Sequence, residues 1–152
     1  MLITRRLEFD AGHRIPNHAS QCRHLHGHRY AIEITLSGPL VATAGAAEEG
    51  MVMDFSAVKA MARQHIVEPW DHAFLAWRRD TAVVDFLGSI AAHKTVLFDA
   101  PPTAEHLAQT AFNVLNPLYK GCYGNDLKLE RVRIYETPNC WADALRRDVS
   151  AS

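Results

Sequence analysis

The sequence is poor in cysteine and lacks a long apolar run. Its three cysteines, Cys22, Cys122 and Cys140, are odd in number and widely spaced, which argues against a disulfide framework and for reduced thiols. No stretch approaches the roughly 18 apolar residues that a membrane span needs, and the first residues carry no apolar core of signal-peptide length. We therefore predict a cytoplasmic protein, with no membrane partner, in which at least one thiol is free for chemistry.

An excess of charge of one sign is also missing. The protein has 16 Lys plus Arg and 17 Asp plus Glu, so nothing indicates a general affinity for nucleic acid or for an anionic membrane. A Gly-rich phosphate loop is absent as well. An anionic ligand would therefore have to be bound by a few local basic residues.

What is present fits one domain. With 152 residues and 48% hydrophobic content, the protein is long enough for one substantial core and short for two, so we predict a single domain over 1–152. Alternation of apolar and polar residues predicts strands over 2–10 and 28–38. The apolar stretch 50–55 indicates a third strand across a long loop.

Helical spacing dominates the middle of the sequence. Apolar residues recur at helical intervals from Asp54, an N-cap candidate, as far as Pro69, which cannot continue a helix and leaves 69–74 as a loop. A weaker helix is predicted over 83–87, and a stronger one from Thr103 to Pro117. A short strand is predicted over 94–98 and a last strand over 127–138. The order of these elements indicates an α+β domain whose mainly antiparallel sheet is covered by helices on one face.

Three histidines have the spacing of a metal site. His26 and His28 are two residues apart, so on a strand they point the same way, and Gly27 between them permits close approach to the backbone. His13, at the end of the neighbouring strand, would complete a three-histidine set. Such a set leaves the fourth position of tetrahedral zinc open, as in catalytic sites.

A noncatalytic site stays open as an alternative. A structural zinc ion needs four protein ligands, and Cys22 or His24 would supply the fourth, because both share the alternation of His26 and His28. This hypothesis describes a structural zinc-binding module. The sequence offers it no CxxC partner.

Glu136 continues the apolar face of the last predicted strand, after Val132 and Ile134. A carboxylate buried without a partner is costly, so we expect one for Glu136. A structural ion pair with an arginine would serve, and so would a ligand that presents two parallel N–H donors.

Six segments resemble the family of 6-pyruvoyltetrahydropterin and 6-carboxytetrahydropterin synthases. In sequence order they are FDAGH (9–13), CRHLHGH (22–28), GMVMDF (50–55), WDH (70–72), PTAEHLA (102–108) and YETPNCWA (135–142). The resemblance implies the tunnelling fold (T-fold): an antiparallel four-stranded sheet with helices packed on one face, which closes into a barrel by oligomerisation. It also implies a homohexamer built from two trimers, with sites between subunits.

The resemblance assigns the metal centre and the base. By motif match, zinc (Zn2+) would be held by His13, His26 and His28, the same set that the spacing indicates. Cys22 matches the catalytic cysteine, which would remove a C–H proton from the substrate. Zinc would act as a Lewis acid toward a substrate oxygen.

Other site residues follow from the resemblance alone. Asp71 and His72 match an acid-base pair, and Glu136 matches a catalytic residue that also binds the pterin ring. Thr103 and Glu105 match a substrate-contacting segment, although helix capping explains both equally well.

Two activities of the family start from 7,8-dihydroneopterin triphosphate. One eliminates triphosphate to give 6-pyruvoyltetrahydropterin; the other cleaves a carbon–carbon bond of the side chain to give 6-carboxy-5,6,7,8-tetrahydropterin, acetaldehyde and triphosphate, for queuosine and other 7-deazapurines. The compact Cys-x3-His-Gly-His spacing and the YETPNCWA ending resemble the second, bacterial type, which we favour. The 39–49 loop, His106 and Trp141 depart from the common pattern. Candidates for binding the triphosphate are Arg14, Arg23, Arg29 and Lys94.

Overall fold

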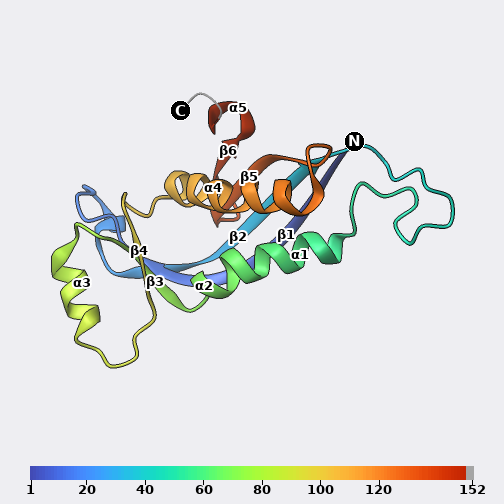
Figure 1. Ribbon diagram of the computed structural model, residues 1–152. Coiled ribbons are helices and arrows are strands. Elements are labelled where there is room, and N and C mark those ends of the chain that lie inside the picture. Colours follow the sequence, from blue (N-terminus) through green and yellow to red (C-terminus); the bar gives the residue numbers. More distant parts are fainter. Residues whose placement is uncertain (150–152) are drawn as a thin grey trace.

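A curled sheet with helices on one face makes up the protein in the computed structural model, which describes residues 1–149 (Figure 1). Over these residues the sheet has six strands, in the order β4-β3-β1-β2-β5-β6. The strands are β1 (Leu2–His13), β2 (His26–Ser37), β3 (Ala73–Trp77), β4 (Thr95–Phe98), β5 (Lys128–Thr137) and β6 (Cys140–Leu145).

The sheet is mixed. β1 and β2 pair antiparallel along their whole length, and β5 and β6 continue the antiparallel part. β3 and β4 are parallel to β1 and extend the sheet at the other edge. The predicted α+β class is confirmed, but the predicted count of four strands is wrong. β3 was missed because it begins inside 69–74, where the end of a helix indicated a loop.

The predicted strand over 50–55 is also wrong. Its backbone bonds stay within the loop: the Val41 amide donates to the Met51 carbonyl and the Met51 amide to the Glu48 carbonyl, at 2.8 and 2.9 Å. Phe55 already begins a helix. An apolar stretch without a neighbouring strand to pair with does not become a strand.

Helices cover the face of the sheet that carries its apolar side chains, with α1 and α4 crossing it in Figure 1. The Asp54 carboxylate caps α1 by accepting from the Ser56 amide at 2.7 Å. The helical elements are η1 (Gln21–Arg23), α1 (Phe55–Ala62), the π-helical η2 (Arg63–Val67), α2 (Glu68–Trp70), α3 (Thr81–Gly88), α4 (Ala104–Tyr123) and α5 (Arg146–Val149). No helix within 1–149 is long and apolar enough to cross a membrane.

Two prolines do not end helices as predicted. Pro69 lies within the short α2 that follows the π-helical turn, and Pro117 lies inside α4. Pro117 is exposed, whereas Leu115 and Tyr119 beside it are fully buried, and the Tyr119 hydroxyl donates to the Val58 carbonyl at 3.1 Å. Proline has no backbone N–H, so the helix lacks one hydrogen bond at Pro117. The buried side chains of Leu115 and Tyr119 offset this loss.

The core lies between the sheet and the α1/α4 layer. It includes fully buried side chains of β2, β5 and α4: Ile32, Ile34, Leu36, Val132, Ile134, Leu107, Phe112 and Leu115. The opposite face of the sheet is polar. One register row across four strands there reads Arg6, Glu33, Arg133, Asp143, with charges that alternate in sign.

Candidate functional site

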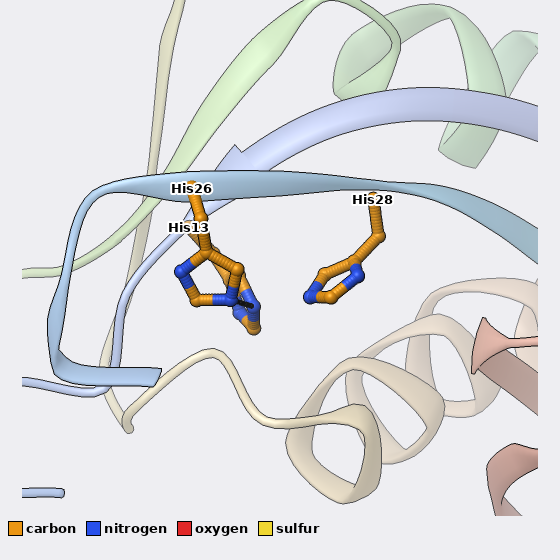
Figure 2. Close-up of side chains that lie close together, drawn as sticks. All are labelled: His13, His26 and His28. Carbon is orange, nitrogen blue, oxygen red and sulfur yellow. Dashed lines mark hydrogen bonds between the residues drawn. The ribbon is translucent and has the colours of Figure 1, made fainter. Parts of the chain in front are cut away.

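Three histidines converge at one end of the β1–β2 hairpin, under the helical layer. β1 continues past its predicted end at residue 10 to His13, which pairs with His26 on β2. His28, two residues further along β2, points to the same side, and Figure 2 shows the three rings turned toward a common point. One nitrogen of each ring lies within 4.8 Å of those of the others.

Backbone carbonyls fix the tautomers of two of these rings. His13 Nδ1 lies 2.8 Å from the Pro102 carbonyl and His26 Nδ1 lies 2.7 Å from the His24 carbonyl. A carbonyl only accepts, so each Nδ1 carries a proton, and in the neutral ring this leaves the lone pair on Nε2. The two Nε2 atoms are 3.1 Å apart, which is close to the separation of about 3.3 Å between two nitrogens on tetrahedral zinc.

Burial disfavours the charged form of two of these imidazoles, His13 and His28. Desolvation is the main cause that lowers the pKa of both His13 and His28, against an opposing effect of the nearby Glu136 carboxylate. His28 Nε2 is buried and has no hydrogen-bond partner. A neutral imidazole with a free lone pair is the form that binds metal, so the three residues fit a zinc ion.

Glu136 reaches the same point from β5. Its Oε1 lies 3.2 Å from His13 Nε2 and 3.7 Å from His28 Nε2. Within 1–149 the side chains that this carboxylate approaches in this way are the two imidazoles and not an arginine. The partner that we expected for this carboxylate is therefore the histidine cluster.

A pocket of about 250 Å³ opens beside the cluster. Cys22, on η1, is half-buried in its wall, and Glu136, Thr103 and Glu105 line it as well. The loop that carries the thiol is fastened by the Ile15 amide, which donates to the Cys22 carbonyl at 2.7 Å. The structure thus brings together Cys22, the carboxylates and the start of α4. Thr103 also caps α4, since its hydroxyl accepts from the His106 amide at 3.4 Å.

Tyr30 belongs to this site, and the sequence patterns did not single it out. Its ring lies 5.5 Å from His28 and 5.9 Å from His13, between centroids, and its buried hydroxyl has no hydrogen-bond partner. Burial, and then the charges of Glu136 and Cys22, raise its pKa far above the usual value, so the hydroxyl stays protonated. Its place in HGHRY could have indicated this, because Tyr30 is two residues after His28 and therefore lies on the same face of the strand.

Asp71 and His72 form a hydrogen-bonded pair, with Asp71 Oδ2 2.8 Å from His72 Nδ1. The Asp10 amide donates to Asp71 Oδ1 at 2.9 Å. This bond is the largest cause that lowers the pKa of Asp71, and the bond to His72 adds to it. The carboxylate is therefore ionised at neutral pH and holds the imidazole by Nδ1.

The structure does not bring this pair to Cys22 within the chain. His72 lines a different, open pocket of about 520 Å³, together with Gly12, Gly27 and Arg29. Gly12 and Gly27 alternate with the three histidines along β1 and β2, so this pocket opens mainly on the other face of the sheet, and His28 lines its edge.

The basic candidates for the triphosphate are already engaged or lie elsewhere. Arg14 makes two bonds to Asp80, at 2.6 and 2.8 Å, and Arg29 pairs with Asp10 at 3.1 Å. Lys94 donates to two backbone carbonyls, and Arg23 is exposed. None of the four lines the pocket of Cys22.

The sheet and its helical layer define a T-fold protein, which carries a histidine cluster that could hold a metal ion, and solved structures share the fold. An uncharacterized protein from Wolinella succinogenes superposes with a TM-score of 0.78 at 22% identity, covering 96% of this chain and 98% of that one. For Caenorhabditis elegans 6-pyruvoyl tetrahydropterin synthase the TM-score is 0.65 at 22% identity, with 95% and 94% covered.

The sequence places the protein in a family. The family described as 6-pyruvoyl tetrahydropterin synthase matches residues 2–147, and the chain belongs to it. A Rickettsia bellii relative named 6-carboxy-5,6,7,8-tetrahydropterin synthase is 36% identical over 140 residues, which are 92% of this chain and 96% of the relative. A Haemophilus influenzae relative of the same name is 30% identical over 144 residues, covering 93% and 96%.

Proposed function

We propose that this protein is a zinc-dependent carbon–carbon lyase that converts 7,8-dihydroneopterin triphosphate to 6-carboxy-5,6,7,8-tetrahydropterin, acetaldehyde and triphosphate. The observation that carries the proposal is the convergence of the lone pairs of His13, His26 and His28 beside a pocket that holds a thiol. The relatives of that name support it over nearly their whole length. The product would serve queuosine and other 7-deazapurine synthesis in the cytoplasm.

The three histidines would hold zinc through their Nε2 atoms, and bound zinc would supply Lewis acidity to an oxygen on the side chain of the substrate. The Pro102 and His24 carbonyls fix the orientation of the His13 and His26 rings before any ion binds. This preorganisation supports an enzyme site, because little rearrangement is then needed on loading.

Cys22 and Glu136 would act on the two ends of the substrate. Cys22 in its thiolate form would accept the proton of a C–H bond next to that oxygen. Glu136 would turn from the histidines to the pterin ring, whose two parallel N–H donors a carboxylate accepts in bidentate fashion. Thr103 and Glu105 line the same pocket and would contact the bound ring.

Asp71 and His72 would serve a site completed by a second copy of the protein. With Nδ1 held by Asp71, His72 Nε2 remains free to give or take a proton. The pair lies on the other face of the sheet from Cys22, so a site that uses all three needs a neighbouring subunit. The curled sheet ends in the two edge strands β4 and β6, which suits closure into a homohexamer of two trimers.

Two alternatives remain distinguishable. Triphosphate elimination to 6-pyruvoyltetrahydropterin would use the same residues and differ in product. A structural zinc module would use Cys22 as fourth ligand, but the histidine group whose atoms lie within 4.8 Å does not include its sulfur. That geometry favours an open metal position.

The deciding experiment is to incubate the zinc-loaded protein with 7,8-dihydroneopterin triphosphate and to identify the pterin and acetaldehyde by mass spectrometry. We expect 6-carboxytetrahydropterin and acetaldehyde in equal amounts. A pyruvoyl product would establish the alternative activity, and no turnover by a fully loaded protein would overturn the proposal. Arg78→Ala, which removes an exposed ion pair with Asp99 outside this pocket, is the matched control.

A further inference from the structure

The turn that carries His72 has an unusual backbone. His72 has a φ of 56°, in the left-handed region that non-glycine residues rarely adopt. Such a conformation persists only where the surroundings hold it, and it is often found at functional sites. The contacts that hold this turn are therefore part of how the His72 ring is aimed.

Asp10 supplies one set of contacts. The His72 amide donates to the Asp10 carbonyl at 2.6 Å, and the Asp10 amide donates to Asp71 Oδ1 at 2.9 Å. These bonds tie the turn to β1 just before β3 begins to pair with Ala11. They fix one side of the turn.

Lys94 supplies the other set. Its Nζ donates to the carbonyls of Glu68 and Asp71, both at 2.6 Å. The backbone of Lys94 is held too, because the Phe74 amide donates to its carbonyl at 2.9 Å. The lysine, just before β4, is therefore bonded to the first residue of α2 and to the residue that follows α2, although its side chain lies at the surface.

Two backbone carbonyls that converge on one point repel each other unless a donor lies between them. An ammonium group has three N–H donors and no acceptor, and its charge strengthens both bonds. One of the two carbonyls belongs to the residue just before His72, so the ammonium restrains the peptide whose rotation would release the left-handed turn.

We propose that Lys94 is a positioning residue, which holds the carbonyls of Glu68 and Asp71 and thereby fixes the His72 ring in the orientation that proton transfer requires. The inference rests on the proposed function, in which His72 carries the proton. It also removes Lys94 from the candidates for binding triphosphate, since two of its donors are used inside the subunit.

The kinetic test uses Lys94→Met, which keeps the length of the side chain and loses the donors. We expect kcat to fall by about 10- to 100-fold, as small misplacements of a catalytic group do, while KM changes by less than about twofold. Lys94→Arg, which keeps the charge and the donors, should recover most of kcat. Lys120→Met, exposed near the C-terminal end of α4, should match the native enzyme.

A second readout needs no substrate. The Cε1–Hε1 NMR signal of His72, assigned by its loss in His72→Gln, should move in Lys94→Met and return in Lys94→Arg. An unmoved signal, or an unchanged kcat, would overturn the inference. If the native protein does not turn over the pterin triphosphate, the proposed function fails while the signal still tests the role of Lys94. Should Lys94→Met not fold, Lys94→Gln, with a shorter neutral side chain, provides both measurements.

Discussion

The Nε2 atoms of His13 and His26 face each other across the β1–β2 pair at 3.1 Å, while both Nδ1 atoms are bonded to backbone carbonyls. Two lone pairs at that distance repel, and a cation between them removes the repulsion. His28 Nε2, buried and without a hydrogen-bond partner, faces the same region. The unpaired ring nitrogens therefore destabilise the β1–β2 pair, and a bound metal ion would remove this destabilisation.

Loss of one ligand should therefore remove the metal. For His26→Ala we expect zinc affinity to fall by more than about 100-fold, beyond the usual cost of losing a residue that only orients a ligand. Metal content after dialysis and a competition titration with a chelator measure this. His65→Ala, on the π-helical turn, is the control. Native affinity in His26→Ala would rule out the cluster as the metal site.

Cys22 should matter for turnover and not for metal. Cys22→Ala should keep native zinc content and lose about 100- to 10,000-fold in kcat, the range for a missing general base. Zinc-edge absorption of the native protein should show nitrogen and oxygen ligands only. A Zn–S distance near about 2.3 Å, with zinc lost from Cys22→Ala, would favour the structural module.

Strand alternation in the sequence was enough to place part of the candidate site. His26 and His28 share a face because they are two residues apart, and the same rule placed Glu136 beside the core. The pairing of His13 with His26 required β1 to continue past its predicted end, which the register with β2 supplied.

Other features depend on contacts between distant residues, which no local pattern contains. The left-handed turn at His72 is held by Asp10 and Lys94, which are 62 and 22 residues away in the sequence. α4 passes Pro117 because Tyr119 is anchored on α1. These are cases in which tertiary packing overrides local propensity.

Two buried tyrosines give a matched pair for stability. The Tyr30 hydroxyl has no partner, whereas the Tyr119 hydroxyl donates to the Val58 carbonyl at 3.1 Å. In the metal-free protein, Tyr30→Phe should leave the free energy of unfolding unchanged or raise it by up to about 1 kcal/mol, and Tyr119→Phe should lower it by about 0.5–1.5 kcal/mol. Urea unfolding of both variants measures the difference. A lower free energy of unfolding in Tyr30→Phe than in the native protein would mean that the Tyr30 hydroxyl has a hydrogen-bond partner in solution.

The charged row on the uncovered face should make stability depend on pH. Arg133 holds Asp143 by two bonds of 2.7 Å, and this pairing is the main cause that lowers the pKa of Asp143 below its usual range. A carboxyl whose pKa is lower in the folded state stabilises the protein above its unfolded pKa of about 3.9 and loses that contribution as pH falls through the folded value. Asp143→Asn should thus lower the free energy of unfolding at pH 7, by about 0.5–1 kcal/mol for a partly exposed pair.

The same substitution should have almost no effect once the carboxyl is protonated in both states. Urea unfolding of native protein and Asp143→Asn at pH 7, 5 and 2.5 therefore tests the sign as well as the size: the two curves should differ at pH 7 and approach each other at pH 2.5. Asp85→Asn on α3 is the control, and should show no such convergence. A gap that stays constant with pH would mean that the bonds of Asp143, and not its charge, stabilise this row, because an asparagine loses one acceptor at any pH.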